Sequence, residues 1–117
     1  MLAVGEHLWG EVDDRVLRMT TGLAGGLGSC QQELCGALNG GALIIGALNG
    51  RTSADVDDTL CGEMVCRYRD RFQAEFNTTQ CYGLQQSGYG SEGQWPCSTL
   101  VEGAARILLD VLDETKP

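Results

Sequence analysis

Three cysteines in this chain stand where a helix is expected to begin, and their placement predicts redox or metal chemistry. Cys35 opens the apolar, glycine-rich run 35–42, whereas Cys81 and Cys97 flank a polar, glycine-rich segment, each near another expected helix start. Free N–H groups and the positive end of the helix dipole favour the thiolate over the thiol at such a position. The thiolate is the form that attacks disulfides and ligates metals, so the three residues are predicted to share one centre.

The other cysteines give weaker indications. Four residues separate Cys30 from Cys35, and four separate Cys61 from Cys66. This spacing occurs in iron–sulfur proteins and also by chance. Helical periodicity places Cys61 in an apolar stripe as a core thiol and Cys66 outside it, exposed to solvent. No Cys-x-x-Cys pair is present, which argues against thioredoxin chemistry, zinc ribbons and covalent haem attachment. With His7 as the single histidine, a Cys–His catalytic pair is not expected.

The bulk composition restricts the kinds of partner. The 117 residues are expected to form one domain, and a net charge of −8 argues against binding to nucleic acid or to an anionic membrane. The longest apolar run, 34–48, is too short for membrane insertion. The first nine residues lack the pattern of a secretory signal. We therefore expect a cytoplasmic protein, in which structural disulfides are rare.

The apolar periodicity predicts an all-α fold, a compact small bundle of about four to five helices. Helices are expected at 2–9, 12–19, 55–76 and from Pro96 onward, with one short helical turn at Cys81. Another helix should end near Asn49. It begins either near Cys30, where Ser29 and Gln32 resemble a capping box, or nearer Leu34. The glycine-rich segment 22–28 precedes it, and residues 82–96 read mostly as a functional loop.

Two of these helices carry informative surfaces. In the helix 55–76, which Asp55 is expected to cap, apolar residues recur at every fourth position: Val56, Leu60, Met64, Tyr68, Phe72 and Phe76. The glycine-rich helix exposes Gly36, Gly40 and Gly41, each of which costs about 1 kcal/mol relative to alanine. Close helix packing or access to a buried centre would offset that cost, and Gly36 and Gly40 are predicted to line the site. Such a small-residue surface is also compatible with a homodimer.

Four segments in this order carry a resemblance: Leu23–Gly28, Cys35–Ala42, Phe76–Cys81 and Trp95–Cys97 with the closing helix. Together they resemble the redox-active protein family named for its C-GCAxxG-C-C pattern, although this chain reads Cys35-Gly36-Ala37 where the name writes Gly-Cys-Ala. The resemblance implies a small helical domain with four signature cysteines, three of which are Cys35, Cys81 and Cys97. It also implies redox activity, with an iron–sulfur cluster as the candidate cofactor. No haem is carried over, because no attachment motif is present.

The resembled pattern has its fourth cysteine in the first helix, and no cysteine precedes Cys30 here. Residues 1–6 look like the interior of a helix, with an apolar side in phase and no cap. We therefore expect the missing cysteine just before Met1 in a longer natural product, which an in-frame reading of the upstream DNA would reveal. The alternative is that Cys30 takes the fourth position.

Three functions follow from these observations. The first is a cytoplasmic redox protein in which Cys35, Cys81 and Cys97 bind an iron–sulfur cluster or another metal and pass electrons to an unknown redox partner. The second is a thiol–disulfide switch or exchanger without metal, with Cys81 and Cys97 as the preferred pair. The third is a helical interaction module whose cysteines fill its core.

Overall fold

The computed structural model describes residues 1–90 and 93–115, and these residues form six helices. In chain order they are α1 (Leu2–Trp9), α2 (Asp14–Thr21), α3 (Gly36–Asn49), α4 (Thr59–Phe76), α5 (Cys81–Gln86) and α6 (Cys97–Glu114). Within the described residues the only β pairing consists of two isolated bridges. The all-α prediction is confirmed. None of the described helices has the length and apolar character needed to cross a membrane.

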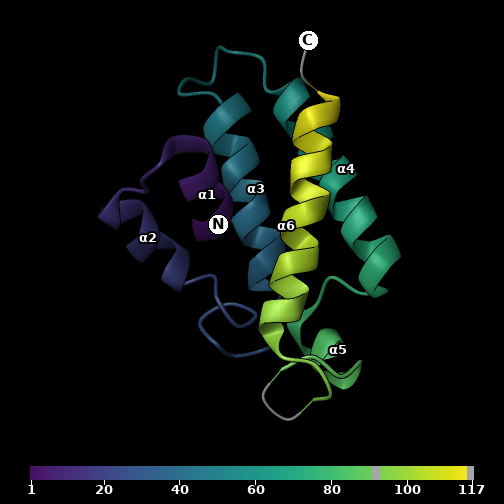
Figure 1. The fold of residues 1–117 in the computed structure, drawn as a ribbon. Coiled ribbons are helices and arrows are strands. Elements are labelled where there is room, and N and C mark those ends of the chain that lie inside the picture. The colour runs from purple at the N-terminus through teal and green to yellow at the C-terminus, as the bar shows by residue number, and fades with distance from the viewer. Residues whose placement is uncertain (91–92, 116–117) are drawn as a thin grey trace.

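Helices α3, α4 and α6 pack against one another and form the centre of the bundle. Figure 1 shows α3 and α6 running in the same direction, with α4 antiparallel to both and α5 beside the ends at which α3 and α6 begin. Each of the three long helices supplies fully or almost fully buried side chains to one core, among them Ile44, Ile45, Met64, Tyr68, Phe72, Leu100, Leu108 and Val111. The core thus fixes the two helix starts that carry Cys35 and Cys97 at one end of the molecule.

The apolar stripe of α4 is partly as predicted. Met64, Tyr68, Phe72 and Phe76 are buried, whereas Val56 and Leu60 are about half exposed, at 52% and 53%. Val56 lies outside the helix, because α4 begins at Thr59 instead of near Asp55, and Leu60 lies in its exposed first turn.

The turn before α4 explains its late start. The guanidinium of Arg51 donates hydrogen bonds to the carbonyl oxygens of Ala54 (3.1 Å) and Val56 (2.9 Å), and it also pairs with Asp58. These carbonyl groups are therefore held in a turn that precedes the helix. The side chain that accepts from the first helical N–H is that of Asp57, which contacts Thr59 N at 3.0 Å, and the predicted cap at Asp55 is wrong.

Helix α3 begins at Gly36, so the later of its two expected starts is the right one. The backbone from Gly25 to Ser29 has positive φ at every residue (61°, 71°, 75°, 57° and 61°), which a right-handed helix cannot contain. Leu27 and Ser29 occupy this left-handed region without being glycine, at a cost of roughly 1–2 kcal/mol each. The capping box expected at Ser29 and Gln32 does not form, because the chain here is a left-handed turn.

Each of three glycines in α3 makes room for a different neighbour. A Cβ atom on Gly41 would overlap the ring of Tyr68 in α4. On Gly40 it would lie 2.9 Å from the backbone nitrogen of Met1, and on Gly36 it would lie 3.2 Å from the Cα atom of Ala24. Close packing inside the chain therefore accounts for the small-residue face, and the homodimer suggested by that face stays a prediction.

Replacing Gly41 by alanine tests this explanation. Alanine normally stabilises a helix by about 1 kcal/mol relative to glycine, but overpacking a core costs typically about 1–3 kcal/mol. We expect Gly41→Ala to lower the free energy of unfolding in urea, because the buried Tyr68 ring cannot move aside. Gly46→Ala is the matched control in the same helix, since no atom lies within 4 Å of a Cβ placed there. It should leave stability unchanged or raise it, and equal effects of the two substitutions would contradict the packing argument.

Candidate functional site

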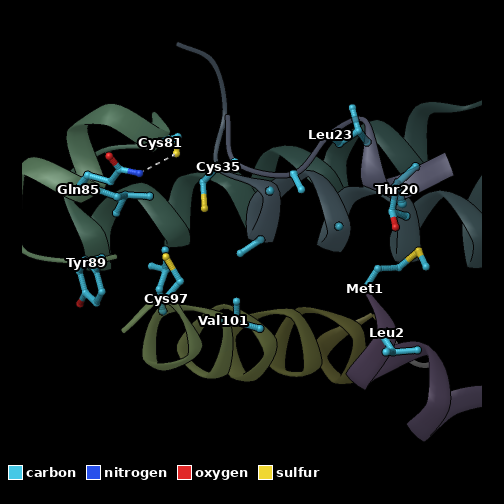
Figure 2. A pocket seen from close by; sticks show the side chains of 18 of the residues that line it. Met1, Leu2, Thr20, Leu23, Cys35, Cys81, Gln85, Tyr89, Cys97 and Val101 are labelled. Carbon is cyan, nitrogen blue, oxygen red and sulfur yellow. Dashed lines mark hydrogen bonds between the residues drawn. The ribbon is translucent and has the colours of Figure 1, made fainter. Parts of the chain in front are cut away.

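Cys35, Cys81 and Cys97 line the same end of one cavity, whose volume is about 320 Å³. The cavity lies beside α3, α5 and α6 and is closed in part by the glycine-rich segment and by α1 and α2. Figure 2 shows the sulfur atoms of Cys35 and Cys97 directed toward the space between α3 and α6, with Cys81 beside them. Its volume falls within the range of small-molecule sites in proteins, at the lower limit of about 300 Å³.

An antiparallel bridge between Leu34 and Gln80 brings Cys35 and Cys81 together. The N–H of Cys35 donates to the carbonyl oxygen of Thr79 (2.9 Å), and the N–H of Cys81 donates to that of Glu33 (2.9 Å). The two cysteines thus make the bridge with their own backbone groups. Cys35 lies immediately before α3, and Cys81 is the first residue of α5. Their relative position is set by the main chain and does not depend on any side-chain contact.

A second bridge, between Tyr89 and Trp95, anchors the segment that leads into Cys97. The N–H of Trp95 donates to Gly88 O (2.8 Å), and the Tyr89 and Trp95 rings lie 5.4 Å apart. Tyr89 also packs edge-on against Phe76 at the end of α4, with ring centroids 5.9 Å apart. Part of the expected functional loop is therefore tied to the core, while residues 91 and 92 of that loop lie outside the described residues.

The glycine-rich segment before α3 packs directly on the cysteine positions. A Cβ atom on Gly26 would lie 2.6 Å from the Cβ of Cys81, and Gly26 has φ +71°. Gly25 lines the cavity, as do Gly36 and Gly40 of α3. Glycine is required at Gly26 both for its backbone conformation and for its approach to Cys81, which links the segment to the site.

Burial is the main cause of the pKa shift of Cys35. The residue is 7% exposed, and this burial raises the pKa of its thiol above the ordinary value. The N–H groups of Ala37 and Leu38 lower that pKa, without the geometry of a regular capping hydrogen bond, and the charges of Cys81 and Cys97 raise it further. The expectation that the helix start favours a thiolate is therefore wrong for Cys35, because desolvation outweighs the helix end.

Cys81 is partly buried, and burial followed by the charge of Cys97 raises the pKa of its thiol as well. Its sulfur accepts a hydrogen bond from Nε2 of Gln85 at 3.8 Å, drawn as a dashed line in Figure 2. Cys97 is exposed as a residue although its side chain faces the cavity. Among the three cysteines it is the most exposed residue.

Sequence reasoning did not identify Gln85 or Tyr89 as site residues, although both line the cavity. Gln85 follows Cys81 by one helical turn, and the i, i+4 spacing within α5 is a signal that could have pointed to it. Tyr89 left no comparable signal, because its place depends on the bridge to Trp95.

The remaining cysteines lie elsewhere. Cys30 is exposed, its sulfur contacts Gly28 O at 3.9 Å, and it does not line the cavity that holds the other three thiols. Cys61 packs against the core and Cys66 is exposed, as their positions in the helical periodicity predict. The structure therefore brings together the three expected site cysteines and leaves the fourth candidate, Cys30, apart.

A metal ion at this site would need ligands from the side chains that the structure describes. Among them, no group of three or more His, Cys, Asp or Glu residues is arranged to hold a metal ion. Among the described residues that line the cavity shared by the thiols, there is no histidine, aspartate or glutamate that could complete a ligand set. The described residues do not by themselves form a metal site, and the iron–sulfur cluster stays a prediction.

A comparison with protein families gives one match, which covers residues 1–111. The matching family is described as "Putative redox-active protein (C_GCAxxG_C_C)". The chain belongs to this family. Comparisons with curated proteins and with solved structures give no match. Membership of the C_GCAxxG_C_C family supports redox activity based on cysteines and leaves the reaction and the cofactor open.

The raised pKa values give a test by alkylation. Below the folded pKa a thiol is protonated and reacts slowly, so Cys35 and Cys81 should react with iodoacetamide more slowly at pH 8 than in the unfolded chain. Their rates should keep rising above pH 10, where an ordinary thiol of pKa about 8.5 is almost fully ionised. Mass spectrometry of residue-specific alkylation measures this.

The Gln85→Leu variant supplies the control for the hydrogen bond. It removes the donor to Cys81 and should raise the apparent pKa of Cys81, while the pH profile of the distant, exposed Cys66 stays the same. Ordinary, coincident pH profiles for all six cysteines would contradict the electrostatic description of the site.

Proposed function

We propose that this C_GCAxxG_C_C protein is a cytoplasmic redox protein that works by reversible disulfide formation between Cys97 and Cys81. The single observation that supports this most strongly is the convergence of Cys35, Cys81 and Cys97, which are far apart in the sequence, on one end of one cavity. The charges of Cys81 and Cys97 raise the pKa of Cys35, and the charge of Cys97 raises the pKa of Cys81, as expected for neighbouring thiols.

The accessibility of the thiols suggests their roles. Cys97, the exposed one, attacks the disulfide of a partner, and Cys81 then attacks the sulfur of Cys97 and releases the partner. Two protein thiols become one disulfide, the partner disulfide becomes two thiols, and the two thiol protons go to the partner sulfurs. Cys35 is too buried to react with the disulfide of a partner, so it takes no part in the exchange between Cys97 and Cys81.

A module whose cysteines only fill its core fits this arrangement less well. Of the three site cysteines only Cys35 is buried, and Cys97 is exposed. A thiol that serves as a small apolar core residue is expected to be buried.

Oxidation in a glutathione buffer tests the proposal. One disulfide should form between Cys81 and Cys97, and two free thiols should be lost. Trypsin leaves both cysteines in one peptide, because no Lys or Arg lies between 72 and 105, but cleavage after glutamate separates them into 76–92 and 93–102. These two peptides should appear joined without reductant and separate with it.

The serine variants complete the test. Cys97→Ser and Cys81→Ser should each abolish the joined peptide, whereas Cys66→Ser should leave it unchanged, since Cys66 is exposed and lies outside the cavity. Oxidation of the chain without this linkage would rule out the pair as the exchanging thiols.

A cluster or metal held by Cys35, Cys81 and Cys97 is the second candidate. It is favoured by the thiolate charges at this end of the cavity, where Cys81 and Cys97 raise the pKa of Cys35 and Cys97 raises that of Cys81, since a bound cation would neutralise these charges. The thiols would act as ligands, and a fourth ligand would have to come from outside the described cavity lining.

Anaerobic purification from iron-replete cells, followed by iron and sulfide analysis, tests this second candidate. If a cluster binds, iron and sulfide should be present and should be lost in Cys97→Ser but kept in Cys66→Ser. A colourless and iron-free protein would count against it and would leave the disulfide reaction as the remaining redox function.

A further inference from the structure

The cavity beside the thiols has a strongly apolar lining. Aliphatic side chains form most of it: Leu17, Leu23, Ala37, Leu43, Leu84, Leu100 and Val101. The polar side chains among the described lining residues are Thr20, Gln85 and Tyr89 besides the three cysteines, and none of the lining side chains is charged. The charged group at the cavity is the amino group of Met1, which lies at the end away from the three cysteines in Figure 2 and whose pKa is lowered by burial. A charged group that entered the space beside the thiols would lose its hydration and would find no charged side chain among the described lining residues, which is unfavourable.

We propose that this cavity selects uncharged disulfides with apolar substituents as the substrates of the thiol pair. The inference rests on the proposed disulfide function and adds the class of substrate to it. One substituent of the disulfide occupies the apolar space between α3 and α6, which places the sulfur–sulfur bond at the end where Cys97 and Cys81 lie. Anionic disulfides are disfavoured by the lining, and the net charge of −8 weakens their approach further.

The exchange balances without any other reactant. The Cys97 thiolate attacks one sulfur of R–S–S–R, which forms a mixed disulfide and releases R–S⁻. The Cys81 thiolate then attacks the Cys97 sulfur, which forms the protein disulfide and releases the second R–S⁻. The substrate disulfide is reduced by two electrons, the protein dithiol is oxidised by two, and the two thiol protons end on the released sulfurs or in water.

Two chromogenic aromatic disulfides separate charge from reactivity. One is 4,4′-dithiodipyridine, which is neutral, and the other is 5,5′-dithiobis(2-nitrobenzoate), which carries two carboxylates. Each rate is measured on a protein that keeps Cys35, Cys81 and Cys97 but has serine at the other cysteines. It is divided by the rate of the same reagent on a protein that keeps only the exposed Cys66. This division removes the intrinsic reactivity of each reagent and the effect of overall charge.

We expect this normalised rate to be at least about tenfold higher for the neutral reagent, because its carboxylate-bearing counterpart would have to be desolvated. Equal normalised rates for the two reagents would overturn the inference. With protein in excess, each molecule of reagent should release two molecules of coloured thiol. Release of only one would mean that Cys81 does not resolve the mixed disulfide, so this outcome overturns the proposed function itself and can be told apart from a failure of selectivity.

Val101 offers a charge test at the cavity. It lies one helical turn after Cys97, lines the cavity and is 44% exposed, so a long side chain there need not disturb the core. Val101→Lys should bring the normalised rates of the two reagents within about twofold of each other, because the ammonium group pairs with the entering carboxylate. Val101→Met, without charge, should keep the preference for the neutral reagent.

The matched control is Leu48→Lys, which adds the same charge to an exposed residue of α3 outside the cavity lining. It should keep the preference of the unsubstituted site. If Leu48→Lys and Val101→Lys change the ratio equally, net charge and not the cavity sets the selectivity, and the inference is wrong.

Discussion

The two hydrogen bonds of the bridge between Leu34 and Gln80 are the constraint on which the site depends. They use the N–H groups of Cys35 and Cys81, so the cysteines cannot separate without breaking backbone pairing. Each bond is worth about 0.5–1.5 kcal/mol net, and more is lost when a buried partner is left unsatisfied. The same bonds determine where α3 and α5 begin, because the residues before Gly36 and Cys81 are held extended.

The glycines of α3 allow the rest of the bundle to close around this bridge. Gly41 accepts the ring of Tyr68, whose hydroxyl donates to the carbonyl oxygen of Ala37 at 3.2 Å. Burial, and then the charge of Cys35, raises the pKa of Tyr68, which therefore stays a neutral donor behind the thiol. On the face of α3 that lines the cavity, Gly40 admits Met1 and Gly36 admits the segment around Ala24. Glycine lowers the stability of the helix, and the three close contacts of α3 offset this loss.

Local signals in the sequence were enough to predict the helices, most of the α4 stripe and the different settings of Cys61 and Cys66, because periodicity depends on neighbours along the chain. The start of α3 and the turn before α4 could not be predicted in the same way. They depend on consecutive left-handed residues from Gly25 and on the contacts of Arg51. Helix-start placement and the resemblance both indicated the three site cysteines, whereas Gln85 required knowledge of the folded α5. The direction of the Cys35 pKa shift also required the fold, since burial is a tertiary property.

The opposition between helix start and burial has a consequence for the redox state. Because the folded pKa values of Cys35 and Cys81 are raised, their stabilising contribution is complete below the pKa of an unfolded thiol and is lost as the pH rises through the folded values. A disulfide carries no charge and avoids the desolvation that a buried thiolate suffers. A disulfide between Cys81 and Cys97 also removes both of the thiolate charges that raise the pKa of Cys35. Rising pH therefore destabilises the reduced site more than the oxidised one, so the apolar surroundings favour disulfide formation although they slow the thiolate chemistry that produces it.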